Sequence, residues 1–373
     1  MKINIVLSHA LPFPPTKGGG IEKINYSLAK SLLKSGHSVT VYSRYEKDLS
    51  FNEIDRYGIK HVRTKAFDWT GSNLVNAFNS LCWCLRLYNR IKPADITIFN
   101  SLFAFIFTKK KGIGIIANSI QRTPDRKLFF YKYFDRNYCT CEAVRQQVLK
   151  LPFRLKDTSL LYNCVEIPET SPVVKKDYSE GFNFFYFGRI KRDKGLMELI
   201  EGFIKSRNLF PQNKLFIRGP YTYKEGADGK FYNLLEQKVN ENDLNNSIKF
   251  FPPAYDKKEL KNFIESNDVA CFTSLSGEGF PSAVLEAMSF YKPVIVSDFG
   301  PMAETIEHLK SGYITKTGNS ESICEAIMYF SENPSLIKTM GLNARERVKN
   351  NFSNDAVAKS LIKDIKQFKE KRN

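Results

Sequence analysis

Residues 274–298 of the chain read SLSGEGFPSAVLEAMSFYKPVIVSD. The pattern predicts a glycine-containing loop, then a helix from Pro281 to Tyr291 that is apolar on almost every side, then a strand. This helix carries one acid in its middle, Glu286, and a second acid, Glu278, lies just before it. An unpartnered carboxylate is costly to bury. The stretch therefore predicts that these acids have polar partners, and the question is which ones.

The start of this helix has the features of an anion-binding site. A predicted strand, Asp268–Thr273, leads into the loop. Pro281 stands at or near the first helical position, where a missing N–H removes no intrahelical hydrogen bond. The free backbone amides around Gly279–Ala283 and the helix dipole together favour a bound anion. Because Gly279 has no side chain, a phosphate can approach its backbone closely.

The two acids make this prediction more specific. A ribose diol can donate two hydrogen bonds to one carboxylate, which suits Glu286, and the loop acid Glu278 can accept from sugar hydroxyls beyond a phosphate. Two alternatives remain open for each acid. It is a solvated surface residue, or it forms a salt bridge with a lysine.

The first half of the chain alternates short apolar runs with amphipathic segments. This rhythm is typical of βαβ units, in which helices cover both faces of a parallel sheet. The predicted strands are Lys2–Ser8, Ser38–Ser43, Lys60–Arg63, Asp95–Phe99 and Gly112–Ala117, and the predicted helices are Ile21–Lys34 and Ser72–Arg90.

A polar, proline-bearing segment, residues 166–181, is predicted to be a linker, because the same rhythm restarts after it. The strands predicted beyond it are Asn183–Phe187, Lys214–Arg218, Ser247–Phe251, Asp268–Thr273 and Pro293–Ser297. We therefore expect an α/β fold with two Rossmann-like, parallel-sheet domains, residues 1–165 and 182–353, facing across a cleft. Residues 354–371 predict one more amphipathic, basic helix.

The composition limits the class of protein. The chain has 373 residues and a formal net charge of +17, which indicates an anionic partner. It has neither an apolar run long enough to cross a membrane nor a signal-peptide pattern, so we expect it in the cytoplasm. Its seven cysteines are scattered and odd in number, which predicts free thiols rather than a disulfide framework. No nucleic-acid-binding motif accompanies the charge, so no nucleic acid partner is expected.

Several motifs in this sequence resemble those of family 4 glycosyltransferases, which are retaining enzymes of the GT-B fold that use nucleotide sugars. Glu278-Gly279-Phe280-Pro281, with Glu286 eight residues after the first acid, resembles the family's E-x7-E signature. The other matching segments are Gly188-Arg189 and Lys194-Gly195, the run Gly18-Gly19-Gly20, and Leu161-Tyr162-Asn163. They cover nearly the full chain and stand in the family's order.

The resemblance implies a role for each matching residue. Glu286 would bind the donor ribose, and Glu278 would bind the donor sugar and act as a catalytic residue. The diphosphate would be bound by Arg189, Lys194, Gly18, Gly19, Gly20, Gly279, Phe280, Pro281 and Ser282. Fixed cations at a leaving diphosphate lower the barrier as negative charge develops there.

The first domain departs from the family pattern. Where relatives often carry histidines, this chain has Asn100 and Asn118, and an amide cannot act as a base. We expect Asn118 to be the catalytic-site contact of the first domain with the donor sugar. In a retaining reaction the leaving phosphate can itself accept the acceptor's proton, so a protein base can be dispensable.

The implied function is transfer of a hexose or N-acetylhexosamine from a nucleotide-diphosphate sugar to a hydroxyl of a glycan or lipid-linked saccharide. A UDP-sugar is favoured, with GDP-mannose second, and synthesis of lipopolysaccharide, capsule or another surface polysaccharide is the expected setting. No cofactor and no metal are expected, because the chain lacks a D-x-D pair. Two alternatives stay open: a sugar-nucleotide epimerase of GT-B fold, and a non-catalytic partner that binds nucleotide sugars.

The resemblance also assigns the acceptor to the first domain, with residues 354–371 packing back on it. There the run Gln121–Tyr138 interleaves aromatic and basic residues. This composition suits contact with an anionic membrane surface, which would make the protein peripheral on the inner face of the membrane. Ordinary core aromatics with solvated charges explain the run equally well.

Overall fold

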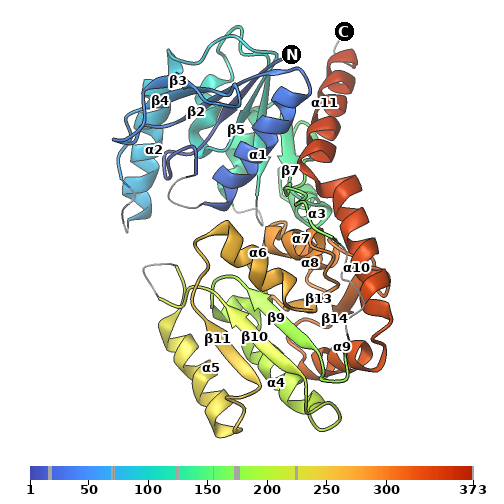
Figure 1. The fold of residues 1–373 in the computed structure, drawn as a ribbon. Coiled ribbons are helices and arrows are strands. Elements are labelled where there is room, and N and C mark those ends of the chain that lie inside the picture. The colour runs from blue at the N-terminus through green and yellow to red at the C-terminus, as the bar shows by residue number, and fades with distance from the viewer. Residues whose placement is uncertain are drawn as a thin grey trace. The chain divides into compact units, whose positions relative to one another are not determined.

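The computed structural model describes residues 1–15, 19–68, 70, 72–121, 126–153, 155–171, 177–222 and 226–371 (Figure 1). The chain divides into two compact units, Met1–Val165 with Ser353–Asn373, and Glu166–Phe352. Each unit is built around its own predominantly parallel sheet with helices packed on it. The predicted α/β class is therefore confirmed.

The first unit contains an eight-stranded sheet of order β3-β4-β2-β1-β5-β6-β7-β8. Its strands are parallel except for the short β3, which pairs antiparallel with β4. The strands are β1 Lys2–Val6, β2 Ser38–Arg44, β3 Asn52–Ile54, β4 Lys60–Thr64, β5 Ile96–Phe99, β6 Ile115–Ile120, β7 Arg136–Cys139 and β8 Thr158–Leu160. The helices are α1 Gly20–Lys34, α2 Asn73–Tyr88, α3 Glu142–Leu149 and α11 Asn354–Glu370, with 3-10 turns η1 Leu102–Phe107 and η2 Arg126–Tyr133.

This sheet has two separate hydrophobic cores, one on each face. Successive side chains of a strand point to opposite faces, so alternate residues of the central strands belong to different cores. On one face Ile3 and Ile5 of β1 pack in a cluster that includes Leu28 and Leu32 of α1 and Leu361 of α11. Figure 1 shows α1 and α11 side by side. On the other face the core includes Val6 of β1, Phe99 of β5, and Trp83 and Leu87 of α2.

One predicted strand of this unit is displaced. The sequence predicts a strand over Gly112–Ala117, whereas β6 spans Ile115–Ile120. The physical reason is that Gly112 and Gly114 both adopt a positive φ, 82° and 68°. A Cβ on Gly114 would lie 2.1 Å from the backbone oxygen of Asp95, so the chain turns tightly there before the strand begins.

The C-terminal helix α11 belongs to the first unit. Its Asp364 accepts a hydrogen bond from Tyr138 Oη at 2.8 Å and another from Ser159 Oγ at 2.8 Å. The same carboxylate pairs with the guanidinium of Arg136. These contacts attach α11 to β7 and β8, so residues from the two ends of the chain form one core.

The second unit contains a six-stranded parallel sheet of order β11-β10-β9-β12-β13-β14. Its strands are β9 Asn183–Phe187, β10 Lys214–Arg218, β11 Ile248–Phe251, β12 Val269–Phe272, β13 Val294–Ser297 and β14 Gly312–Thr315. Its helices are α4 Leu196–Ser206, α5 Gly229–Glu241, α6 Lys257–Glu265, α7 Ser282–Ser289, α8 Gly300–Ala303, α9 Ser320–Glu332 and α10 Leu336–Arg347, with the 3-10 turn η3 Arg192–Lys194 and the π-helical turn η5 Val348–Phe352.

Helix α7 is shorter than the predicted Pro281–Tyr291. Pro281 is the N-cap residue, with extended dihedrals of −81° and 102°, and the helix begins at Ser282. At the other end Tyr291 adopts a left-handed φ of 61°, which no α-helix can continue. The sequence predicts a longer helix because the apolar residues continue into the turn after α7, where Phe290 is also buried.

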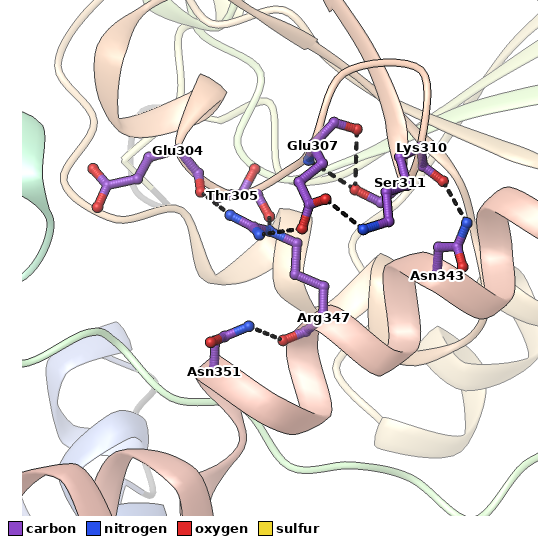
Figure 2. A network of polar contacts seen from close by, with 8 residues as sticks. All are labelled: Glu304, Thr305, Glu307, Lys310, Ser311, Asn343, Arg347 and Asn351. Carbon is purple, nitrogen blue, oxygen red and sulfur yellow. Dashed lines mark hydrogen bonds and ion pairs between the residues drawn. The ribbon is translucent and has the colours of Figure 1, made fainter.

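A polar network holds the segment that follows α8 (Figure 2). Arg347 on α10 donates from Nε to the Thr305 carbonyl at 2.8 Å and from an Nη to the Glu304 carbonyl at 3.0 Å. Its other Nη pairs with Glu307 at 2.9 Å, and Lys310 pairs with the same carboxylate at 2.7 Å. One guanidinium therefore satisfies two backbone carbonyls and one acid of this irregular segment.

No helix among the described residues is long and apolar enough to cross a membrane. All seven cysteines are free thiols; Cys82 is half-buried and the other six are buried.

Candidate functional site

The strand order of the second unit indicates where a ligand binds. β9 lies between β10 and β12, so the chain runs outward from β9 in one direction and later returns to add strands on the other side. In open parallel sheets ligands bind at such switch points, outside the carboxyl ends of the strands. The loops that leave β9 and β12 meet at this place, and they contain most of the predicted site residues.

The loop after β9 is packed tightly against its neighbour. Gly188 has a φ of 148°, and its N–H donates to the Arg218 carbonyl at 3.0 Å. A Cβ on Gly219 would lie 1.8 Å from the Gly188 oxygen, so only glycine lets these two loops touch. Arg189, which follows, is exposed, and its backbone carbonyl accepts a hydrogen bond from Tyr186 Oη at 2.9 Å.

The structure brings two predicted site residues together as an ion pair. Lys194 Nζ lies 2.5 Å from Glu278 Oε1 and 3.2 Å from Asp193 Oδ2. The Lys194 side chain is only 9% exposed and that of Glu278 23% exposed. The sequence left open that Glu278 pairs with a lysine, and the structure identifies Lys194 as that lysine.

The pair is positioned by backbone contacts between the two loops. Gly195 has a left-handed φ of 66°, and Thr273 Oγ1 donates to its carbonyl at 2.9 Å. Ser274 Oγ donates to Glu278 Oε1 at 3.2 Å, and Ser297 Oγ donates to the Ser274 carbonyl at 2.6 Å. These three hydroxyl residues could not be recognised from the sequence, because nothing in their spacing distinguishes them from ordinary strand ends.

The N-terminus of α7 lies directly after Glu278. Ser282 and Glu286 are four residues apart and therefore share one face of the helix. Both are half-buried, whereas Val284, Leu285, Ala287 and Met288 are buried. A ligand held at the first turn of α7 could extend along this face. Such a ligand could contact Glu286, although Glu286 lies eight residues after Glu278.

Tyr186 on β9 lies close to these acids. Burial raises the pKa of its hydroxyl far above the usual range, and the negative charges of Glu278 and Asp193 raise it further. The hydroxyl is therefore neutral throughout the physiological range and acts as a hydrogen-bond donor rather than a base.

In the first unit, the predicted glycine loop is described from Gly19 onward; Gly18 lies outside the described residues. Gly19 has a φ of 96° and is the N-cap residue of α1. A Cβ there would lie 2.2 Å from Glu22 Oε2, so that side chain would have to move, and the positive φ itself favours glycine. Glu22, which the sequence analysis did not single out, is 4% exposed, and burial raises its pKa.

Two asparagines lie on or directly after neighbouring strands of the first sheet, β5 and β6. Asn100 directly follows β5, and Asn118 lies on β6, where its register partner is Phe99 of β5. Asn118 is fully buried, and no described residue hydrogen bonds to its side-chain oxygen or nitrogen. The side-chain atoms of Asn100 are likewise buried and have no hydrogen-bond partner among the described residues. Buried amides are normally paired, so these two are candidates for ligand contacts.

His9, three residues after the end of β1, is also buried. Burial lowers its pKa, and the charge of Arg44 lowers it further. The ring is therefore neutral at physiological pH.

The run Gln121–Tyr138 is described except for residues 122–125 and the side chains of 126–128. Its residues divide between two environments. Phe134 and Tyr138 belong to the core, whereas Phe129, Phe130 and Tyr133 are exposed. Within the described part of the chain, no three His, Cys, Asp or Glu side chains gather in a way that could hold a metal ion.

Comparison with known proteins identifies the second unit. Residues 169–347 match the family described as "Glycosyl transferases group 1". An uncharacterized glycosyltransferase of Methanocaldococcus jannaschii is 24% identical over an alignment of 354 positions, which covers 86% of each chain. The alpha-1,3/1,6-mannosyltransferase ALG2 of Homo sapiens is 27% identical over an alignment of 220 positions, which covers 56% of this chain and 52% of that protein.

A solved structure extends the likeness to both units. HepE of Anabaena, solved in complex with UDP, superposes with a TM-score of 0.75 at 18% identity, covering 98% of this chain and 100% of that one. The chain therefore has the GT-B fold, its residues 169–347 form a domain of the glycosyl transferases group 1 family, and it is a glycosyltransferase.

Proposed function

We propose that this glycosyltransferase is a retaining, family 4 enzyme that transfers a hexose or N-acetylhexosamine from a nucleoside-diphosphate sugar to a hydroxyl of a glycan or lipid-linked saccharide. The observation that carries the proposal is the meeting of Lys194 and Glu278 at the switch point of the second sheet, directly before α7. The reaction belongs in lipopolysaccharide, capsule or other surface polysaccharide synthesis. A UDP-sugar is the favoured donor, since HepE was solved with UDP. GDP-mannose is the second candidate donor, since ALG2 is named a mannosyltransferase.

In this proposal the donor diphosphate competes with Glu278 for Lys194. The diphosphate carries two negative charges, whereas the carboxylate carries one, so it draws the ammonium toward itself. Arg189 and the backbone N–H groups of Gly279, Phe280 and Ser282 add donors, while Pro281 has no N–H and only shapes the turn. Because these groups are fixed before reaction, they stabilise the charge that develops on the leaving phosphate.

Glu278, once released from Lys194, accepts hydrogen bonds from hydroxyls of the donor sugar. Glu286, one turn into α7, accepts from the ribose diol. In the first unit, the buried amides of Asn118 and Asn100 are proposed to bind substrate hydroxyls, which would supply the partners that no described residue gives them. The leaving phosphate takes the acceptor's proton, so we propose that the enzyme works without a metal or a protein base.

The first unit is the proposed acceptor side, and contact with an anionic membrane through residues 121–138 belongs to this proposal. Its support is the exposed set Phe129, Phe130 and Tyr133, with Lys132 Nζ 3.8 Å from the ring centroid of Phe129. Aromatic rings and cations together suit the headgroup region of a bilayer.

The test compares three variants in two assays. Thermal unfolding is measured with UDP, GDP and ADP, and transfer is measured with the matching sugar donors. A nucleotide at about 100 times its Kd stabilises the protein by about 2.7 kcal/mol. We expect Lys194→Met to lose this stabilisation. Glu278→Ala should keep it but lose transfer by about 100-fold or more. Glu321→Ala, which breaks the exposed Lys205–Glu321 pair, is the control and should change neither result.

Each other outcome identifies an alternative. If Glu278→Ala lowers the melting temperature yet leaves transfer intact, the ion pair is purely structural and the proposal fails. Isomerisation of the donor without any acceptor would identify an epimerase. Nucleotide binding without turnover of any donor would identify a non-catalytic partner, and loss of transfer in EDTA would contradict metal independence.

A further inference from the structure

Helix α2 of the first unit carries apolar side chains on the face that points away from the protein. Leu74 is 84% exposed, Phe78 64% and Leu85 57%, and Leu81 between them is half-buried. These four residues, here called the α2 stripe, are spaced by four, three and four positions, so they lie in one row along the helix. Such a row normally faces a core.

The core-facing side of α2 is a different row. Its buried residues are Asn76, Asn79, Trp83, Cys84 and Leu87, and this row is centred about half a helical turn from the α2 stripe. Surface helices usually oppose an apolar face with a charged one. Between Asn73 and Tyr88 the only charged residue is Arg86, so α2 lacks the polar outer face of a solvated helix.

Basic residues surround the α2 stripe. On one side Arg86 lies 4.9 Å from the ring centroid of Phe67, and its Nη1 donates to the Lys65 carbonyl at 3.1 Å. On the other side Lys110 lies 4.4 Å from the ring centroid of Tyr88, and its neighbours Lys109 and Lys111 are exposed. The single acid of residues 65–90, Asp68, is paired with Arg44 at 2.7 Å.

The apolar surface continues from α2 across η1 to η2. η1 packs against α2 and also against η2, where Phe105 stacks on Phe130 at 4.8 Å between ring centroids. Phe129, Phe130 and Tyr133 of η2 are exposed, and Lys132 lies over two of these rings. Apolar and aromatic side chains accompanied by cations thus occur on α2, η1 and η2, which contact one another in that order. Figure 1 shows α2 on the outside of this unit.

We infer that the α2 stripe is a membrane-docking face, and that its occupant is an anionic lipid surface. Leu74, Phe78 and Leu85 enter the boundary between headgroups and acyl chains, while the surrounding lysines and Arg86 contact lipid phosphates. Charge complementarity favours this occupant. The interior of an anionic bilayer can receive the apolar row, and its phosphates can pair with the surrounding basic residues. A second copy of the chain would present the same basic border, so two like-charged borders would face each other and oppose association.

The inference is independent of the proposed transfer reaction, because it rests on elements that contain none of the proposed donor-binding residues. It also differs from the expected contact through residues 121–138, since it assigns the inserting side chains to α2. The two surfaces adjoin through η1, so both can meet the same bilayer.

The test is vesicle binding by the full chain. Flotation is measured with vesicles of phosphatidylcholine alone and of phosphatidylcholine mixed with phosphatidylglycerol, at low and at high salt. We expect binding to the mixed vesicles that weakens with salt, because salt screens the lysine contacts. The variant Leu74→Ser/Phe78→Ser/Leu85→Ser should bind these vesicles with an affinity at least about tenfold lower than that of the parent chain.

A matched control changes three exposed apolar residues of the second unit, Leu209→Ser/Leu234→Ser/Tyr255→Ser, which are 63%, 40% and 83% exposed. It should bind vesicles as the parent chain does. An unchanged melting temperature and an unchanged nucleotide-induced shift in both variants show that folding and donor binding are intact.

Equal vesicle binding by the α2 variant and the parent chain would overturn the inference. So would the absence of binding to either kind of vesicle. If the parent chain self-associates in solution and the α2 variant does not, the occupant is a second copy and the lipid assignment is wrong. If nucleotides do not raise the melting temperature of the parent chain but the parent chain binds vesicles, only the proposed function is contradicted.

Discussion

Gly195 shows how one residue sets the geometry of the candidate site. It adopts a left-handed φ of 66° directly after Lys194, and a Cβ there would lie 2.0 Å from the backbone oxygen of Thr273. Only glycine allows the loop after β9 to touch the end of β12. That contact is what brings Lys194 to Glu278, although the two are 84 positions apart in the sequence.

The chain offers a matched pair of glycines for testing this. Gly318 has a similar φ of 72°, but a Cβ there would meet only Leu275 Cδ2 at 3.8 Å. Gly318→Ala should cost about 1–2 kcal/mol, the price of a left-handed alanine. Gly195→Ala should lower the unfolding free energy by about 1–3 kcal/mol more, because the clash forces the loops apart. Urea denaturation measures both. Equal losses would show that the loop moves freely and that the contact does not position Lys194.

The residue types at the candidate site were predictable, whereas their contacts were not. Glu278, Glu286, Lys194 and Arg189 stand out because their spacing matches a family pattern. Which lysine pairs with Glu278 depends on two loops that meet only in the folded sheet. The hydroxyl of Ser274 is also invisible to sequence reasoning, because a serine after a strand is common.

At the scale of elements, apolar runs predicted most strands of both sheets, but not their ends. β6 begins three residues later than expected, because the glycines before it form a turn. The shift places Asn118 inside the strand instead of just after it, and a strand position explains why its amide is fully buried. Short strands such as β3 and β8 have three residues each, too few to show an alternating pattern.

Helix α10 stabilises an irregular segment through Arg347 (Figure 2). The planar guanidinium donates to two carbonyls and one carboxylate, an arrangement that the ammonium of lysine cannot reproduce. Arg347→Lys should therefore lower the unfolding free energy of the second unit by about 1–3 kcal/mol, because two part-buried carbonyls lose their donors.

Lys310→Ala is the control for this prediction. It removes an exposed ion pair with the same Glu307 and should change stability by less than about 0.5 kcal/mol. Denaturant unfolding of both variants is the measurement. If Arg347→Lys is as mild as Lys310→Ala, the segment is held by its own turns and not by α10.

At the scale of the whole molecule, the sequence predicted two α/β units but could only place the last helix by resemblance. An amphipathic, basic pattern shows that residues 354–371 form a helix with one apolar face. It does not say which core receives that face. In the structure Asn354 N–H donates to the Val165 carbonyl at 3.1 Å, and Leu361 and Ile365 enter the core that contains Ile3 and Ile5.

Because the chain returns to the first unit, the stability of this unit depends on α11, which begins more than 180 positions after Val165. Leu361 is 1% exposed, and Leu361→Ala should lower the unfolding free energy by about 2–5 kcal/mol. Because each unit has its own core, we expect faster amide hydrogen exchange in residues 1–165 and α11, with residues 166–352 unchanged. Lys363→Ala, on the exposed side of α11, should alter neither unit. Equal acceleration in both units would mean that they unfold as one cooperative body, and that the two cores are not energetically separate.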